Sequence, residues 1–397
     1  MRVLFIAYHP VAHSIMLSQG LPYMRGLAQR GIQYSLLSYE TDKSREFSRK
    51  YAADFGAPLK WRYLKYHQKP RILATLLDIV LGILAVSGII IRDKPGIIHA
   101  RGFIPALMAF VPAKIFQTKL LFDTRGLLAD KYVCGGLVRK DKLTYRLMRG
   151  GEDFLLKHAE IFTVETQSHA RVIKNSYGAL AGRMRVIPCC VDTEKFDYQR
   201  YKPGPADEFR LVYLGQVGTW YLLDKMLDFF KVAAAAFESA RFIFITESDP
   251  DIFYAQARKM EINEEQIIVK SAGNKEIPVL LATASAGIFF MNPYKRYNTF
   301  PIKFGEYLAS GLPVVLNRGI GDCDAIIKNE KVGVVVNEFS VAEYQKAAAG
   351  LKALLKEKEA LRSRCRLAAE KHCALTVGIE SYADIYKTLL KRGGLRS

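Results

Sequence analysis

The residues best suited by type and spacing to do chemistry are a lysine and a glutamate three positions apart. Lys303 and Glu306 follow Pro301 at the expected start of a helix that Gly311 ends. Residues three apart share one helical face. The free N–H groups of a helix N-terminus attract a phosphate, to which Lys303 would add a cation, and a carboxylate one turn further on can accept two hydrogen bonds from a ribose diol. A surface ion pair explains the same spacing, so both interpretations stand at this point.

Polar side chains also follow three apolar runs in the first half of the chain, where buried strands would end. In a parallel sheet these ends lie at one edge, which is where ligands bind. Helix capping by His13 and a salt bridge within the Asp123 and Arg125 loop are the structural alternatives. The candidates are His9 and His13 after the first run, His99 and Arg101 in the second, and Asp123 and Arg125 at the end of the third.

The elements that would position these side chains alternate between short apolar runs and segments long enough for a helix. Such alternation is typical of a parallel sheet covered by helices on both faces. The spacing also predicts one helix over residues 14–30, ended by Gly31. The strands expected in the first half are residues 3–8, 34–38, 96–100, 119–123, 161–164 and 184–187.

The same order of elements starts again in the second half. The expected fold class is therefore α/β, with two Rossmann-like, doubly wound parallel-sheet domains facing a central cleft. Helices are predicted over residues 222–237 and 377–391, the latter amphipathic. The strands expected here are residues 210–214, 241–246, 266–270, 286–291, 313–317 and 333–337.

An irregular stretch rich in proline, glycine and charge follows Pro188 and separates the two series. Such composition marks a linker between domains. We expect a first Rossmann-like domain at residues 1–198, a second at residues 199–375, and a C-terminal helix at residues 376–397 that crosses back to the first.

Residues 72–91 form a twenty-residue apolar stretch in which Asp78 is the single charge. At 1.5 Å per residue, a helix of this length is long enough for a bilayer of about 30 Å. A carboxylate near the middle of a span costs roughly 2.5 to 3.5 kcal/mol, however, and Gly82 and Gly88 weaken the helix. We therefore expect a buried core helix, with contact along a membrane surface or a true span as the alternatives.

The composition excludes intrinsic disorder, because 50% of the 397 residues are hydrophobic and 24% are charged. Six cysteines without a C-x-x-C pair indicate neither a disulfide scaffold nor structural zinc. The apolar run at the N-terminus is too short for a secretory signal, so a cytoplasmic protein is expected.

The net charge of +19 is unevenly spread along the chain. Residues 1–200 hold 31 Lys and Arg against 16 Asp and Glu, whereas residues 201–397 hold 27 against 23. A positive first half attracts a phospholipid leaflet, nucleic acid or a phosphorylated substrate, although charge kept for solubility explains it as well.

The run around Lys303 resembles the donor-site signature of the family 4 glycosyltransferases, which have the GT-B fold. Other segments match the same family in the same order along nearly the whole chain, and the joint match is specific. The signature residues are Pro301, Lys303, Glu306, Tyr307, Leu308, Ala309, Gly311, Pro313 and Val314, and the other segments are IIHARG at 97–102, FDTRG at 122–126, VIPCCVDTEKF at 186–196 and LVYLGQVGTWY at 211–221.

The resemblance assigns roles to residues on both domains, the first binding the acceptor and the second the nucleotide sugar. Glu306 would hold the ribose, and Lys303 would meet the diphosphate together with the loop of Gly215, Gln216, Gly218 and Thr219. Asn298 stands where the family often has a glutamate, and Gln216 where it has a basic residue, for which Lys225, Lys295 or Arg296 would substitute. His99, Arg101 and Asn298 would be catalytic, and His9, His13, Asp123 and Arg125 would lie on the acceptor side.

The resemblance implies a retaining hexosyltransferase that moves a sugar from a nucleotide-diphosphate sugar to a lipid-linked or polysaccharide acceptor, as in polysaccharide biosynthesis at the cell envelope. No cofactor or metal is expected, since GT-B enzymes neutralise the leaving diphosphate with side chains and helix N-termini. The basic first half would dock peripherally on the inner face of a membrane. Nucleic acid is not an expected partner, because no recognised module accompanies the charge. The alternatives are an inactive sugar-nucleotide or glycan-binding protein, motivated by Asn298 and Gln216, and a GT-B nucleotide-sugar epimerase.

Overall fold

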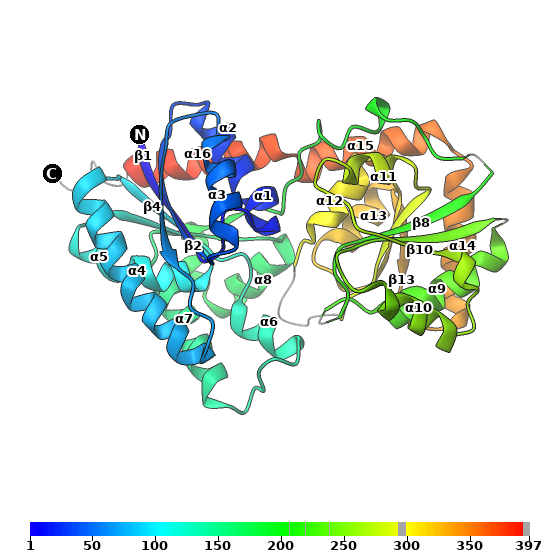
Figure 1. Ribbon diagram of the computed structural model, residues 1–397, viewed down its shortest axis with the longest axis horizontal. Helices are drawn as coiled ribbons and strands as arrows, with labels where there is room; N and C mark the ends of the chain where they lie inside the picture. Colours follow the sequence, from blue (N-terminus) through cyan, green and yellow to red (C-terminus); the bar gives the residue numbers. More distant parts are fainter. Residues whose placement is uncertain (206, 219, 238, 293–298, 392–397) are drawn as a thin grey trace. The chain divides into compact units, whose positions relative to one another are not determined.

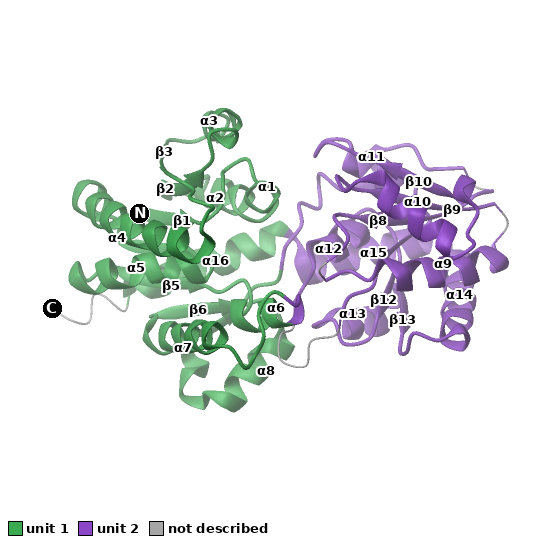
Figure 2. Cartoon of the chain, turned by 60° about the horizontal axis from the view of Figure 1, so that its bottom comes forward, with its two compact units in different colours: residues 1–133, 137–188, 375–397 green, residues 134–136, 189–374 purple. Residues whose placement is uncertain are grey.

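Two compact units, each built around one parallel sheet, make up the chain (Figures 1 and 2). The computed structural model describes all residues except 206, 219, 238, 293–298 and 392–397. Unit 1 consists of residues 1–133, 137–188 and 375–397, and unit 2 of residues 134–136 and 189–374.

The described strands of unit 1 form a sheet in the order β3-β2-β1-β4-β5-β6-β7, with every pairing parallel. Its central strands are buried apolar runs, as a sheet covered on both faces requires. The strands are β1 (Arg2–Ala7), β2 (Gln33–Glu40), β3 (Leu59–Lys65), β4 (Ile97–Arg101), β5 (Lys119–Asp123), β6 (Ile161–Val164) and β7 (Met184–Val186).

The helices of unit 1 come mostly from the connections between these strands. The last helix is an exception, because it arrives from the C-terminal end of the chain and packs against α2 and β4. The helices are α1 (Ser14–Gln19), α2 (Leu21–Ala28), α3 (Ser44–Ala53), α4 (Arg71–Asp93), α5 (Phe103–Ile115), α6 (Leu128–Cys134), α7 (Leu143–His158), α8 (Gln167–Ser176) and α16 (Leu375–Lys391).

Unit 2 repeats the plan with a parallel sheet whose described strands run in the order β10-β9-β8-β11-β12-β13. Phenylalanine rings fill its core, with Phe242 packed between Phe230 and Phe244. The strands are β8 (Phe209–Leu214), β9 (Ala240–Ile245), β10 (Ile267–Lys270), β11 (Ala286–Phe289), β12 (Val314–Asn317) and β13 (Gly333–Val336). The helices are α9 (Leu223–Ala236), α10 (Pro250–Lys259), α11 (Ile277–Ala282), α12 (Ile302–Ala309), α13 (Cys323–Glu330), α14 (Val341–Leu355) and α15 (Glu359–Cys373).

The strand order of each sheet reverses at one point. In unit 1 the reversal falls between β1 and β4, and in unit 2 between β8 and β11. Connections leave such neighbouring strands in opposite directions, which opens a crevice beyond their carboxyl ends. The α/β class with two parallel-sheet domains is thereby confirmed, and the loops after these strands are where ligands are expected in each unit.

One local prediction in the first half is wrong, and one strand was not predicted. The helix expected over residues 14–30 is two helices, α1 and α2, because the chain breaks at Gly20 and Pro22 lies in the first turn of α2. Strand β3 has no counterpart in the predicted set. It lies at the edge of the sheet, where half-exposed residues and the charged side chains of Lys60 and Arg62 replace an apolar run.

The boundary between the units lies at 188/189 in the structure, whereas the sequence places it at 198/199. Residues after Pro188 already pair within unit 2, since the Val191 N–H donates to the Cys373 carbonyl at 2.8 Å. The chain returns to unit 1 after Ala374, and the helix that follows is α16.

The apolar stretch at residues 72–91 lies within α4, a helix of 23 residues. Among the described residues it is the one helix long and apolar enough to cross a membrane, with 33% of its most apolar window buried. The core helix expected from sequence is therefore buried along one face only.

Candidate active site

Lys303 lies in the first turn of α12 and is the central group of the predicted donor site. Pro301 caps this helix with an extended backbone at φ −63° and ψ 131°. The preset φ of proline suits the residue before a helix, and it fixes where the first turn begins. Lys303 thus follows directly on the helix N-terminus.

The Lys303 ammonium is buried against aromatic rings. Its side chain is 5% exposed, and Nζ lies 3.5 Å from the ring centroid of Tyr221 and 4.1 Å from that of Tyr213. Nζ has no hydrogen-bond partner among the residues that the structure describes. Burial lowers the pKa of Lys303 well below its ordinary value, while the Glu306 charge partly offsets this. A buried cation with unused donors is suited to receive an anionic group.

Glu306 lies one turn further along the same helix and is partly buried. Burial raises the pKa of its carboxyl to about 7, although the Lys195 and Lys303 charges act against the shift. Sequence reasoning missed Lys195, whose Nζ donates to Asn274 Oδ1 at 3.0 Å and lies over the Phe196 ring. Lys195 lies in the segment at 186–196 that resembles the family, and that resemblance is the signal that could have identified it. No spacing rule links Lys195 to Glu306.

The loop after β8 approaches Lys303 through a glycine. Gly215 has φ +115° and Gly218 φ +120°, a region that L side chains rarely adopt. A Cβ on Gly215 would lie 3.2 Å from Lys303 Nζ. The Tyr213 hydroxyl donates to the Gln216 carbonyl at 2.6 Å, which fixes the loop next to the ring that covers Lys303. The structure thus brings Gly215, Lys303 and Tyr213 together.

The other donor-side residues fall elsewhere or outside the described part. Lys225 lies on α9, where its Nζ is 3.2 Å from Asp228 and 3.6 Å from Asp224. Its charge is therefore balanced by its own helix. The remaining residues, Thr219, Lys295, Arg296 and Asn298, lie outside the described residues.

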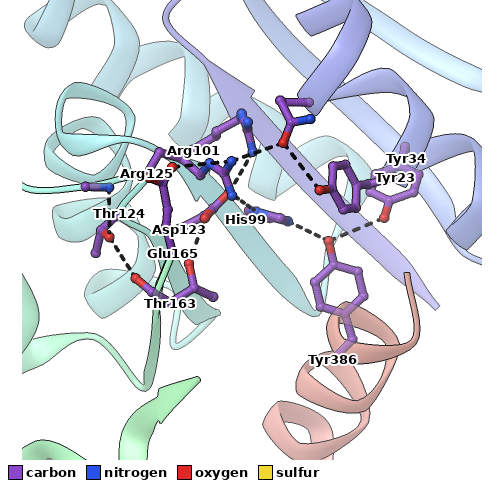
Figure 3. Close-up of polar contacts among 12 residues, drawn as sticks. Tyr23, Tyr34, His99, Arg101, Asp123, Thr124, Arg125, Thr163, Glu165 and Tyr386 are labelled. Carbon is purple, nitrogen blue, oxygen red and sulfur yellow. Dashed lines mark hydrogen bonds and ion pairs between the residues drawn. The ribbon is translucent and has the colours of Figure 1, made fainter. Parts of the chain in front are cut away.

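In unit 1, Asp123 is the centre of a buried polar network (Figure 3). Its carboxylate accepts hydrogen bonds from Arg101 Nη1 at 2.9 Å and Thr163 Oγ1 at 2.7 Å, and it lies 3.4 Å from His99 Nε2. Burial alone would raise the pKa of Asp123, but the Arg125 and Arg101 charges and the His99 hydrogen bond hold it far below its usual range. Asp123 is therefore an anion with its partners in place.

The two neighbours of Asp123 have further partners. His99 Nδ1 lies 2.7 Å from the Tyr386 hydroxyl on α16, and burial lowers the pKa of this histidine. Arg125, with φ +48°, donates to Gln19 at 3.1 Å and lies 3.4 Å from Glu165. The salt bridge of Asp123 runs to Arg101 on the neighbouring strand, whereas the loop arginine pairs with Glu165.

His9 and His13 follow β1 and stack on one another with ring centroids 4.8 Å apart. His13 Nδ1 accepts from the Ile15 N–H at 3.2 Å, so this residue caps α1. Desolvation by the surrounding protein lowers the pKa of both rings, that of His9 to about 4, although both residues keep an exposed surface. Both histidines are thus neutral near pH 7.

The carboxyl edges of the two sheets carry most of the predicted residues. His9 and His13 follow β1, while Arg101 and Asp123 end β4 and β5. Gly215 follows β8, and Lys303 lies between β11 and β12. Within the described ranges, no group of three or more His, Cys, Asp or Glu side chains is placed to hold a metal ion.

Two doubly wound parallel-sheet units of this kind are the architecture of the GT-B fold. Solved structures support this fold at low sequence identity. Sucrose-phosphate synthase from Thermosynechococcus elongatus has a TM-score of 0.75 at 15% identity, covering 99% of this chain and 100% of that one. HepE of Anabaena in complex with UDP has a TM-score of 0.71 at 13% identity, covering 98% and 100%. The lipopolysaccharide outer core galactosyltransferase WaaB has a TM-score of 0.66 at 13% identity, covering 98% and 100%.

Family comparison divides the chain at residue 195, close to the boundary between the units at 188/189. Residues 23–195 match Glycosyltransferase Family 4, and residues 195–372 match Glycosyl transferases group 1. The chain therefore belongs to the family 4 glycosyltransferases, enzymes that use nucleotide sugars. A search of curated proteins finds no match.

Proposed function

We propose that the protein transfers a hexosyl residue from a nucleotide-diphosphate sugar to a lipid-linked or polysaccharide acceptor, with retention of anomeric configuration. The observation that carries the proposal is Lys303, a buried ammonium next to Gly215 with no hydrogen-bond partner among the described residues. A diphosphate supplies the anion that such a site lacks.

The donor would be held by three parts of unit 2. Lys303 and the N-terminus of α12 face the diphosphate, and the glycines after β8 allow backbone N–H groups to come close to it. Glu306 accepts hydrogen bonds from the ribose hydroxyls. As the sugar leaves, negative charge grows on the diphosphate, and the Lys303 cation stabilises it. Retention is typical of the family and would rest on positioning by the enzyme.

The acceptor side is assigned to unit 1, and His99, Arg101 and Asn298 remain predicted catalytic residues. His9, His13, Asp123 and Arg125 remain predicted acceptor-side residues. The lipopolysaccharide galactosyltransferase among the similar structures makes a glycolipid acceptor the first class to test. No metal is invoked in this scheme.

The first experiment is a thermal-shift screen of UDP-, GDP- and ADP-sugars. UDP-sugars come first, because HepE is described with UDP bound. A donor at 100 times its Kd stabilises the folded state by about 2.7 kcal/mol. The best donor is then radiolabelled in its sugar and incubated with glycolipid and polysaccharide fractions.

The outcomes distinguish the proposed transferase from the alternative functions. Label on a glycolipid or polysaccharide supports transfer. An epimerised sugar without transfer indicates a nucleotide-sugar epimerase. A thermal shift without nucleotide release from any donor indicates an inactive binding protein, and no shift with any nucleotide sugar contradicts the donor site.

A further inference from the structure

A row of apolar side chains on α4 is turned outward along the full length of the helix. These side chains are between 47% and 66% exposed, although large aliphatic groups are usually buried. The α4 row consists of Ile72, Leu73, Leu76, Leu77, Val80, Leu84 and Ile91. Its ends are about 28 Å apart at 1.5 Å per residue.

The neighbouring helix carries two further exposed apolar side chains. α5 packs alongside α4 in unit 1, as Figure 1 also shows. Near its C-terminal end Val111 is 45% and Ile115 67% exposed. A Cβ added to Gly82 would meet Met108, so the middles of the two helices touch. We call the α4 row together with Val111 and Ile115 the α4–α5 face.

The opposite face of α4 is fixed in unit 1. Ala74, Asp78, Gly82 and Val86 recur every four residues and are buried. The Tyr39 hydroxyl donates to the Asp78 carbonyl at 2.7 Å. A helix packed in this way against a sheet and a second helix is not surrounded by lipid, so the helix is not a membrane span.

Both acidic residues of α4 are turned toward this buried face. The Asp78 carboxylate accepts from the Tyr8 hydroxyl at 2.7 Å and lies 2.6 Å from His67 Nδ1. The Asp93 carboxylate pairs with Arg62 at 2.7 Å, and hydrogen bonds from Arg62 and Ser35 overcome the effect of burial and lower its pKa to about 2. The helix therefore presents no carboxylate beside its apolar row.

Basic side chains lie at both ends of the row. Arg71 precedes Ile72, and Arg92 and Lys94 follow Ile91, all three exposed. None of them forms an ion pair with a residue in the described part of the chain. Lys114 on α5 adds a further exposed cation, which lies 3.6 Å from Glu160.

We propose that the α4–α5 face docks in the plane of an anionic phospholipid bilayer. A helix with an outward apolar row enters the boundary between headgroups and acyl chains, while cations at its ends contact lipid phosphates. The uncompensated positive charge favours this occupant over a second copy of the chain, whose identical face would bring like charges together. The proposal does not depend on the donor site in unit 2.

The experiment is sedimentation of the full-length protein with vesicles of phosphatidylcholine, with and without phosphatidylglycerol. The wild type is expected to bind the anionic vesicles preferentially. The triple substitution Ile72→Gln, Leu76→Gln and Leu84→Gln should weaken binding at least about tenfold. The matched control is Ile252→Gln, Val341→Gln and Leu367→Gln, three exposed apolar residues of unit 2.

A charge variant tests the same face without altering its apolar row. Arg71→Glu with Arg92→Glu should weaken binding to anionic vesicles by at least about 25-fold, because each cation near the surface contributes about 1 kcal/mol. Lys259→Glu with Lys356→Glu, two exposed lysines of unit 2, is the control. This variant decides the matter if the triple substitution does not fold.

Three results would overturn the proposal. The first is that the wild type sediments with neither vesicle, and the second is that both face variants bind as the wild type does. The third is that light scattering shows a dimer that the triple substitution dissociates, without any vesicle binding. The donor-induced thermal shift of each variant is measured in parallel, so loss of the donor site is distinguished from loss of docking.

Discussion

Asp123 in unit 1 and Lys303 in unit 2 are both buried charges, with exposures of 0% and 5%. They differ in how the charge is balanced. Asp123 has an arginine and a threonine within 2.9 Å, whereas the described residues give Lys303 Nζ aromatic faces and no hydrogen bond. Burial by itself therefore does not show whether a charged group has hydrogen-bonding capacity left for a ligand; its hydrogen-bond partners show this.

The largest expected effect is on stability, from Asp123→Ala. Removing one partner leaves Arg101 buried without its anion, which should lower the free energy of unfolding by about 3 to 5 kcal/mol in urea denaturation. Asp141→Ala, in an exposed pair with Arg139, should cost less than about 1 kcal/mol. Equal losses in the two variants would contradict the role of Asp123 as a buried charge whose partners depend on it.

Lys303→Met should weaken donor binding without destabilising the protein, whereas Asp123→Ala should destabilise it. Loss of a charged hydrogen-bonding group should weaken donor binding about 10- to 100-fold, while the ligand-free protein becomes no less stable, because an unpartnered buried charge is removed. Isothermal titration and thermal unfolding measure the two quantities. Lys231→Met, at an exposed lysine paired with Glu261, is the control. A variant that loses stability yet binds donor normally would make Lys303 a structural residue.

Donor affinity should depend on pH through Glu306, whose pKa is raised to about 7. Only the ionised carboxylate accepts both ribose hydrogen bonds, so affinity should fall about tenfold per unit as pH drops below 7. In the ligand-free protein the pH dependence of stability has the opposite sign to that of donor affinity. The stability that the raised pKa contributes is present in acid and is lost as pH rises through 7. Glu306→Gln should abolish the pH dependence of donor affinity and that of stability. If the donor affinity of this variant still falls as pH drops below 7, Glu306 is not the group that titrates.

The smallest effect is expected at Tyr221, a positioning residue that holds Lys303 through its ring. Tyr221→Leu should weaken donor binding about fivefold, the equivalent of about 1 kcal/mol for a cation–π contact. Tyr221→Phe keeps the ring and should bind as the wild type does. If the two substitutions behave alike, the ring face does not hold the ammonium.

Much of the fold could be predicted from apolar runs and from the polar and turn-forming residues that bound them. The strands at β1, β4, β5 and β8 lie where the sequence indicates, because a strand buried on both faces must be apolar throughout. Edge strand β3 lacks that requirement, and Gly20 divides a helix whose apolar spacing continues across it. The predictions from sequence therefore fail where burial constrains the order of apolar and polar residues least.

Only part of the candidate site could be predicted from the sequence. The helix start at Pro301 and the spacing of Lys303 and Glu306 are local, so they appear in the sequence. Lys195 is more than one hundred positions from Glu306, and no periodicity relates the two. The row on α4 was visible as apolar, but its exposure depends on which side α5 covers.

The sequence by itself determined the family, the two parallel-sheet domains and the helix that carries Lys303, because motifs and burial patterns are properties of short segments. Only the tertiary structure decided that Asp123 is saturated, that aromatic rings hold Lys303 and that half of α4 faces outward. Those facts depend on neighbours distant in the chain, and hydrogen bonding and burial are determined by neighbours in space.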